Sequence, residues 1–230
     1  MSTRAIFALI LVAGAGGCRQ SSQQPQFPNA HREVAPIVND SFSTEDARDR
    51  VGEAEQVISL AGIQAGMSVA DIGAGEGYYT VRLAPVVGPK GRVLAEDIVP
   101  DVEDRLAQRV HRENLDNVAV KLGEPDDPML PSKSFDRIFM VHMYHEVQSP
   151  YAFLWHMREA LKPDGQVIVV DANRPTKRHG IEPRLLECEF AAVGLKLVNT
   201  VPISEGENYF AAFRIAAPRQ APDQIKACAS

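Results

Sequence analysis

Three glycines follow an acidic residue within residues 69–80, which read VADIGAGEGYYT. Gly73, Gly75 and Gly77 alternate with other residues directly after Asp71 and Ile72. Glycine is needed where the backbone takes a positive φ, or where a ligand must approach more closely than a Cβ would allow. The N–H groups of such a turn, placed at the start of a helix, can hold a carboxylate or another anion. The segment therefore predicts a ligand-binding turn between a strand and a helix.

A second acidic side chain ends the next predicted strand, residues 92–98, whose last residues are LAEDI. At the end of that strand, the carboxylate of Asp97 faces the crevice in which ligands bind and can accept hydrogen bonds from both hydroxyls of a ribose. Together with the glycine turn, this position favours a nucleoside-containing ligand over a solvated loop acid. Dinucleotide sites carry the spacing G-x-G-x-x-G, which differs from the spacing here, so an NAD-binding oxidoreductase is disfavoured.

Candidate acid–base residues follow the predicted strand at residues 135–141, in the segment HMYHE. A neutral imidazole can accept a proton near pH 7, and His142 is the best-placed candidate, with His145 and Glu146 as further ones. Structural roles remain open as well. His145 can hydrogen-bond the loop instead, and Glu146 can cap the following helix.

The elements that position these residues alternate between helix and strand. This alternation predicts a parallel sheet with helices on both faces. The last two strands have no helix between them and are expected to pair as an antiparallel hairpin. Helices are expected at residues 44–60, 78–87, 101–113, 150–161 and 183–193, and strands at 68–72, 92–98, 118–122, 135–141, 166–171, 195–202 and 209–215.

Four segments, taken in order, resemble the motifs of class I S-adenosylmethionine (SAM)-dependent methyltransferases. They read VADIGAGEGYYT, VLAEDIVP, LGEPDDPMLPSKSFDRIFMVHMYHEV and LKPDGQVIVVDANRP. The resemblance extends over roughly residues 45–215. It implies an α/β, three-layer, Rossmann-like sandwich with a mostly parallel seven-stranded sheet and an antiparallel C-terminal hairpin strand. It also implies SAM as the cofactor.

The resemblance assigns roles to the residues of the glycine turn and of the second strand. Gly73, Gly75 and Gly77 are expected to lie along the methionine part of SAM, while Asp71 orients the turn. Asp97 is expected to bind the ribose.

The adenine end of the implied site departs from the usual Gly-Asp-Ala pattern of the family. Glu124 aligns with the acid that contacts the adenine amino group, but Pro125 follows it and has no N–H. An amide contact to adenine would therefore come from Asp126. Ile98 is expected to pack against the adenine face.

On the acceptor side, the resemblance places the end of the fourth strand beside the transferred methyl group. Methyl transfer is an in-line displacement, so the protein mainly aligns the acceptor, and a base is needed only when the nucleophile is protonated. No Asp/Asn-Pro-Pro-Tyr/Phe motif follows this strand, which argues against methylation of exocyclic amines on DNA bases or of glutamine. No cysteine lies there to attack a pyrimidine.

The composition of the chain restricts the classes of molecule that it is expected to bind. The net charge of −6 argues against nucleic acid as the main partner. The three cysteines, Cys18, Cys188 and Cys228, form neither a CxxC pair nor a Cys/His cluster, so no metal site is expected. Nothing in the sequence indicates a Cys188–Cys228 disulfide.

A basic loop holds Arg174, Lys177, Arg178 and His179 and is expected to be solvated, although it could bind an anion.

The first 18 residues are typical of a bacterial export signal. Arg4 precedes a short apolar run, and small residues lead to Cys18, as in lipoprotein signals whose cysteine is lipidated. We therefore expect a signal at 1–18, a polar tether at 19–42, the methyltransferase domain at 43–216 and a loose tail at 217–230. The expected location is the periplasmic side of a membrane, or the cytoplasm if these residues are not a signal.

Two hypotheses about function follow. The first is an enzyme that methylates a small-molecule or lipid-like acceptor. The second is an exported lipoprotein that keeps the SAM- or nucleotide-binding fold without catalysis, because SAM is made in the cytosol and fold does not guarantee function. The sequence indicates neither the acceptor atom nor the oligomeric state.

Overall fold

The computed structural model describes residues 25–37, 44–203 and 206–229. Among these residues, no helix is both long enough and apolar enough to span a membrane. The predicted export signal, including Cys18, lies outside the described residues.

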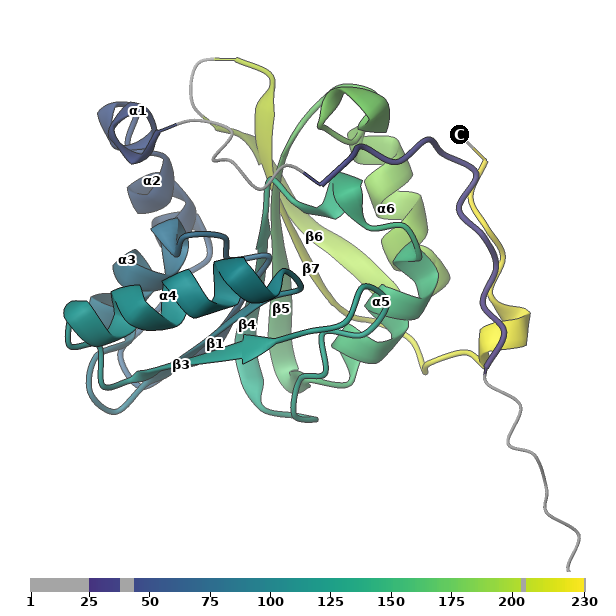
Figure 1. Ribbon diagram of the computed structural model, residues 1–230. Helices are drawn as coiled ribbons and strands as arrows, with labels where there is room; N and C mark the ends of the chain where they lie inside the picture. Colours follow the sequence, from purple (N-terminus) through teal and green to yellow (C-terminus); the bar gives the residue numbers. More distant parts are fainter. Residues whose placement is uncertain (1–24, 38–43, 204–205, 230) are drawn as a thin grey trace, which may run out of the picture.

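A seven-stranded sheet with the order β3-β2-β1-β4-β5-β7-β6 forms the centre of the molecule (Figure 1). Neighbouring strands are parallel except that β7 pairs antiparallel with both β5 and β6. This confirms the predicted fold class. The strands are β1 Ser68–Ile72, β2 Arg92–Asp97, β3 Val118–Leu122, β4 Phe135–Val141, β5 Leu161–Ala172, β6 Leu195–Pro202 and β7 Asn208–Ile215.

Two hydrophobic clusters hold the helices against opposite faces of the sheet. Side chains alternate across a strand, so Val69 of β1 packs with α2 and α3, while Ala70 and Ile72 pack with α5 and α6. Figure 1 shows these two pairs of helices on either side of the sheet. The α-helices are α1 Glu45–Arg50, α2 Glu53–Leu60, α3 Tyr78–Val87, α4 Pro100–Arg112, α5 Pro150–Arg158 and α6 Pro183–Ala192.

The single helix expected at residues 44–60 is in fact two helices. Gly52 has a left-handed conformation with φ 63°, which ends α1 and starts α2 in a new direction. Similarly, α5 ends at Arg158 and β5 begins at Leu161, five residues earlier than the expected strand at 166–171. At residues 44–60 the turn at Gly52 interrupts the helical pattern. At Leu161 the pairing with Phe135 of β4 replaces the helical pattern by a strand.

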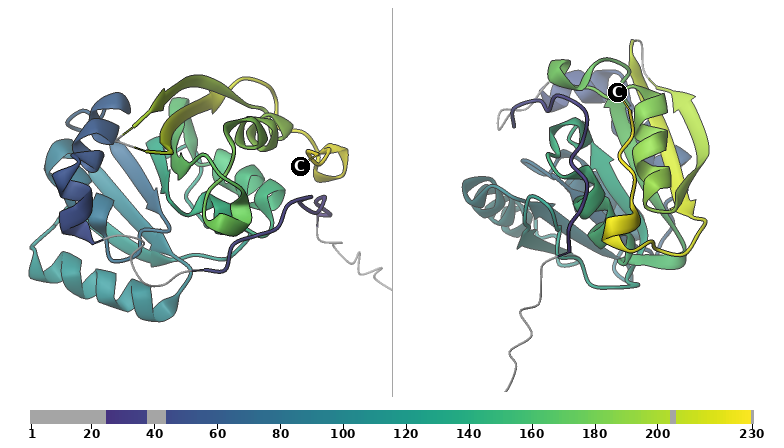
Figure 2. Two further views of the ribbon diagram at one scale, coloured as in Figure 1. Left: turned by 90° about the horizontal axis from the view of Figure 1, so that it is seen from above. Right: turned by 90° about the vertical axis from the view of Figure 1, so that its right-hand side faces the viewer.

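The described parts of the expected tether and tail pack against the domain, contrary to the sequence-based prediction. Phe27 lies edge-on to Trp155 of α5, with ring centroids 5.5 Å apart. From the other terminus, the Gln220 carbonyl accepts a hydrogen bond from Trp155 Nε1 at 2.9 Å, and Ile225 is buried. Both segments lie on the side of the molecule that carries α5 and α6 (Figure 2).

A disulfide joins Cys188 of α6 to Cys228 near the C-terminus. Cys228 is buried, and its backbone N–H donates to the Tyr151 hydroxyl at 2.7 Å. No sequence pattern indicates this bond, because only the docking of the C-terminal segment brings the two thiols together.

Candidate functional site

A cavity of about 700 Å³ opens at the carboxyl ends of β1, β2 and β4. In open α/β sheets, ligands bind at this edge, where the strand order reverses; here the reversal lies between β1 and β4. The volume is within the range of about 300–1,000 Å³ that small-molecule pockets have. Residues of the glycine turn, of the end of β2 and of the end of β4 all line it.

The three glycines of the turn have positive φ, but the space around them differs. A Cβ on Gly73 would lie 2.9 Å from Met143 Cγ, and one on Gly77 would lie 2.5 Å from Leu106 Cδ1. A Cβ on Gly75 would meet no atom within 4 Å. Gly73 and Gly77 therefore allow close packing around the turn, whereas Gly75 faces open space, and both Gly73 and Gly75 line the cavity.

The Asp97 carboxylate joins the end of β2 to the glycine turn. Its Oδ2 accepts the N–H of Gly75 at 3.0 Å, and its Oδ1 accepts the N–H of Val99 at 3.0 Å. These bonds fix the carboxylate at the cavity wall. A carboxylate has about four acceptor positions, so capacity remains for ligand hydroxyls.

Two further carboxyl groups lie buried beside the turn. Burial raises the pKa of Asp71 to about 6, even though the Thr80 hydroxyl donates to it at 2.6 Å. Burial also raises the pKa of Glu96 to about 8, with Gly73 N–H as its hydrogen-bond donor at 3.4 Å. Asp71 therefore links the end of β1 to the first turn of α3 through Thr80, while burial favours the neutral form of Glu96.

Only some of the residues near the predicted adenine end line the cavity. Ile98 and Pro125 line the cavity. Glu124 and Asp126 are exposed and do not line it. The Asp126 carbonyl is instead 3.0 Å from a ring nitrogen of His156. Their role toward adenine stays a prediction.

His142 is at the opposite wall of the cavity, directly after β4. Its Nε2 is 3.4 Å from Oε2 of Glu53, a buried residue of α2. Burial alone would raise the pKa of Glu53, but the hydrogen bond and charge of His142 and the charge of Arg48 lower it to about 2. The imidazole therefore has beside it a carboxylate whose ionised form is favoured.

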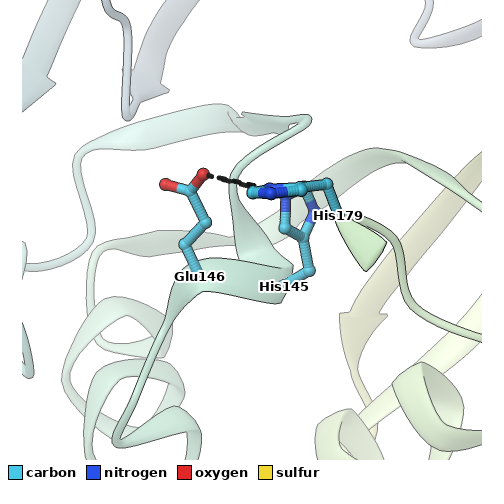
Figure 3. Close-up of side chains that lie close together, drawn as sticks. All are labelled: His145, Glu146 and His179. Atoms are coloured by element: carbon cyan, nitrogen blue, oxygen red, sulfur yellow. Dashed lines mark ion pairs between the residues drawn. The ribbon is translucent and has the colours of Figure 1, made fainter. Parts of the chain in front are cut away.

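His145 and Glu146 also line the cavity, on the short turn η1 Tyr144–Glu146. His145 is buried, and its Nδ1 lies 2.9 and 3.0 Å from the two carboxylate oxygens of Asp171, near the end of β5. His179 follows the turn η2 Thr176–Arg178, and its Nδ1 lies 3.8 Å from Glu146 Oε1. Figure 3 shows Glu146 and the two imidazoles turned toward one another.

Three residues that line this wall or contact it were not predicted as site residues. Glu53 follows a helical pattern and carries no motif. Asp171 could have been found, because it ends a strand at the same sheet edge as Asp97. His179 was assigned to a solvated basic loop, and the expectation of no metal site rested on spacing along the chain, which does not reveal that the fold brings His179 to His145 and Glu146.

Comparison with known proteins identifies the family. Residues 63–200 match the family model described as a methyltransferase domain. A ubiquinone/menaquinone biosynthesis C-methyltransferase from Hahella chejuensis is 29% identical over 125 residues, which is 52% of this chain and 48% of that protein. A protein-L-isoaspartate O-methyltransferase from Methanothrix thermoacetophila is 26% identical over 48% of this chain and 50% of its own. The chain thus spans about half the length of these relatives.

Solved structures agree with this assignment. A SAM-dependent methyltransferase from Aquifex aeolicus has a TM-score of 0.67 and 26% identity, covering 73% of this chain and 91% of its own. The residues present also fit SAM: Gly75 leaves open space at the turn, and Asp97 is held at the cavity wall with acceptor capacity to spare. The chain belongs to the methyltransferase-domain family and has the fold of class I SAM-dependent methyltransferases.

Proposed function

We propose that this enzyme methylates a small-molecule or lipid-like acceptor bound at the His142 end of the cavity. The observation that carries the proposal is the continuity of one cavity from Gly75 and Asp97, the predicted SAM-binding residues, to the polar wall of His142 and Glu146. Apolar side chains, among them Val147 and Phe153, line the same space. The charged side chains of the lining are mostly acidic, so the cavity suits a neutral organic acceptor better than an anionic one.

The bound cofactor supplies a methyl group already activated on a sulfonium. The chain must hold the acceptor in line and, for a hydroxyl or thiol acceptor, remove its proton. His142 is the base in this proposal. When its Nε2–H donates to Glu53, Nδ1 is the basic nitrogen, and the ionised carboxylate stabilises the imidazolium that forms.

Tritium-labelled SAM tests this proposal directly. The purified chain is incubated with methyl-labelled SAM and a panel of quinols, phenols, thiols and a total lipid extract. Label is expected in an organic-soluble product, and His142→Asn should lower kcat by about 10²–10⁴-fold while leaving SAH affinity within about twofold. His111→Asn, on an exposed position of α4, is the control. Label that stays on SAM in every incubation, while SAH still binds, would favour the non-catalytic lipoprotein.

We also propose that the protein is exported and anchored through a lipid on Cys18. The signal-like residues 1–18 motivate this proposal. The Cys188–Cys228 disulfide adds support, because disulfides persist in oxidising compartments such as the periplasm. The enzyme would then need a supply of SAM outside the cytosol.

Metabolic labelling with a radioactive fatty acid tests the anchor. The wild-type chain should carry label in the membrane fraction, whereas Cys18→Ala should not. Cys188→Ala is the control and should keep the label. An unlabelled wild-type chain contradicts lipidation.

A further inference from the structure

Three potential metal ligands meet at the edge of the cavity. One ligand atom each from His145, Glu146 and His179 lies within 4.8 Å of the others (Figure 3). Glu146 Oε1 is 3.9 Å from His145 Nε2 and 3.8 Å from His179 Nδ1. In a tetrahedral zinc site with bonds of 2.0–2.2 Å, ligand atoms lie about 3.4 Å apart, so side-chain shifts of at most about 1.4 Å would close the site.

Asp171 orients the central ligand. Because its carboxylate accepts from His145 Nδ1–H, the lone pair of His145 is on Nε2, the nitrogen that faces Glu146. Asp171 is itself fully buried and also accepts the N–H of Ala172 at 2.8 Å. A metal-binding histidine usually donates the N–H of its other ring nitrogen to a carboxylate, a backbone carbonyl or water.

Arginine side chains hold the backbone of both ligand-bearing segments. Arg32 donates to the carbonyl oxygens of His145 at 3.3 Å and of Val147 at 3.1 Å. On the other segment, Arg174 Nε donates to the His179 carbonyl at 3.0 Å. His179 itself has a left-handed φ of 55°, a conformation that residues other than glycine adopt only where their surroundings require it.

We propose that His145, Glu146 and His179 bind a divalent transition metal such as Zn²⁺, with an open coordination position toward the cavity. Two imidazoles and a carboxylate suit zinc and its neighbours rather than Mg²⁺ or Ca²⁺, which prefer oxygen ligands. Three protein ligands leave a position for another molecule, as in catalytic zinc sites. His145 and Glu146 line the cavity, so this position is accessible to the acceptor.

The role of the metal rests on the proposed function. A hydroxyl or thiol of the acceptor would coordinate the metal through its oxygen or sulfur and pass its proton to His142, which lines the same cavity. Coordination lowers the pKa of such a group, which leaves an anionic nucleophile for the methyl group. The inference thus restricts the acceptor to molecules with a metal-binding oxygen or sulfur atom.

Metal binding can be measured without any acceptor. The purified chain is stripped with a chelator, saturated with SAH and titrated with Zn²⁺ by calorimetry and with Co²⁺ by visible absorption. We expect one site with a Co²⁺ spectrum typical of low coordination number. Glu146→Gln and His179→Gln should abolish that spectrum, and Asp171→Asn should weaken binding by about 10–100-fold.

The control is His111→Gln, which should bind the metal like wild type. Retained SAH affinity shows that each variant is folded. The inference is overturned if wild type binds neither ion at micromolar concentrations, or if Glu146→Gln and His179→Gln bind as wild type does.

Methyl transfer separates the two proposals. Removing the metal should lower transfer at least tenfold, and Zn²⁺ should restore it. Full transfer by the metal-free enzyme overturns the role of the metal and leaves the proposed function intact. A chain that binds the metal at these residues but methylates nothing in the panel keeps the metal site and contradicts the proposed function.

Discussion

Arg32 and Glu189 form an ion pair of 2.9 Å in which both side chains are almost fully buried, at 2% and 1% exposure. Glu189 also accepts the Tyr144 hydroxyl at 2.7 Å. The guanidinium donates in addition to backbone carbonyls of the turn that carries His145. A residue of the expected tether therefore anchors one wall of the candidate site.

Replacing Arg32 with alanine should destabilise the protein by about 3–5 kcal/mol, because the Glu189 carboxylate would remain buried without its counter-ion. Urea unfolding of the purified chain measures this. Arg50→Ala, at an exposed position of α1, is the control and should change stability by less than about 0.5 kcal/mol. Equal stability of the two variants would show that the pair does not hold the segment.

The Cys188–Cys228 disulfide closes a loop with a sequence separation of 40 residues. Its removal in Cys188→Ser/Cys228→Ser should lower the free energy of unfolding by about 2–4 kcal/mol, since the cross-link restricts the unfolded chain. Thermal unfolding with and without reductant measures the loss. Reductant should destabilise wild type and leave the double variant unchanged; the same response in both would contradict a disulfide.

Glu96 should make the ligand-free protein less stable as pH rises. Burial and the nearby Asp97 and Asp71 raise its pKa to about 8, against the opposing effects of the Gly73 N–H and Lys121. The folded state therefore binds this proton more tightly than the unfolded state, so its favourable effect is lost between about pH 4.5 and pH 8. Glu96→Gln should remove this decline in melting temperature. Glu187→Gln, on the surface of α6, should retain it. Identical pH profiles for Glu96→Gln and wild type would contradict the shift.

Glu53 should have the opposite dependence. Its pKa is lowered to about 2 in the folded protein by His142 and Arg48, despite its burial. Its stabilising effect is full above the unfolded value of about 4.5 and is lost as pH falls toward about 2. The stability difference between wild type and Glu53→Gln should therefore shrink on acidification. Glu55→Gln, exposed on the same helix, should show no such trend, and a constant difference for Glu53→Gln would refute the assignment.

Most of the fold could be predicted from the sequence because its strands and helices have strong, separate periodicities. β1, β3 and β4 have the predicted boundaries, and the hairpin of β6 and β7 is antiparallel as expected. The failures arise where tertiary contacts decide. Neither the turn at Gly52 nor the docking of residues around Ile225 is visible in a local pattern.

The contact between the glycine turn and the end of β2 is easier to predict from sequence than the arrangement of the acceptor wall. Gly75 follows β1 and Asp97 ends β2, the next strand along the chain and its neighbour in the sheet. Their spacing in the sequence therefore predicts that they lie side by side. The acceptor wall joins Glu53, Asp171 and His179 to the end of β4. These residues come from separate elements, and only the assembled fold brings them together.

Calorimetric titration of SAH into the purified chain tests the central claim most directly. Wild type should bind one SAH, and Asp97→Ala should bind it about 5- to 150-fold more weakly, the effect of about 1–3 kcal/mol for ribose hydroxyls left poorly paired. Asp101→Ala, an exposed acid at the start of α4, should bind as wild type does. Wild type that binds no SAH, or Asp97→Ala that binds it with undiminished affinity, would contradict a SAM site formed by the glycine turn and Asp97.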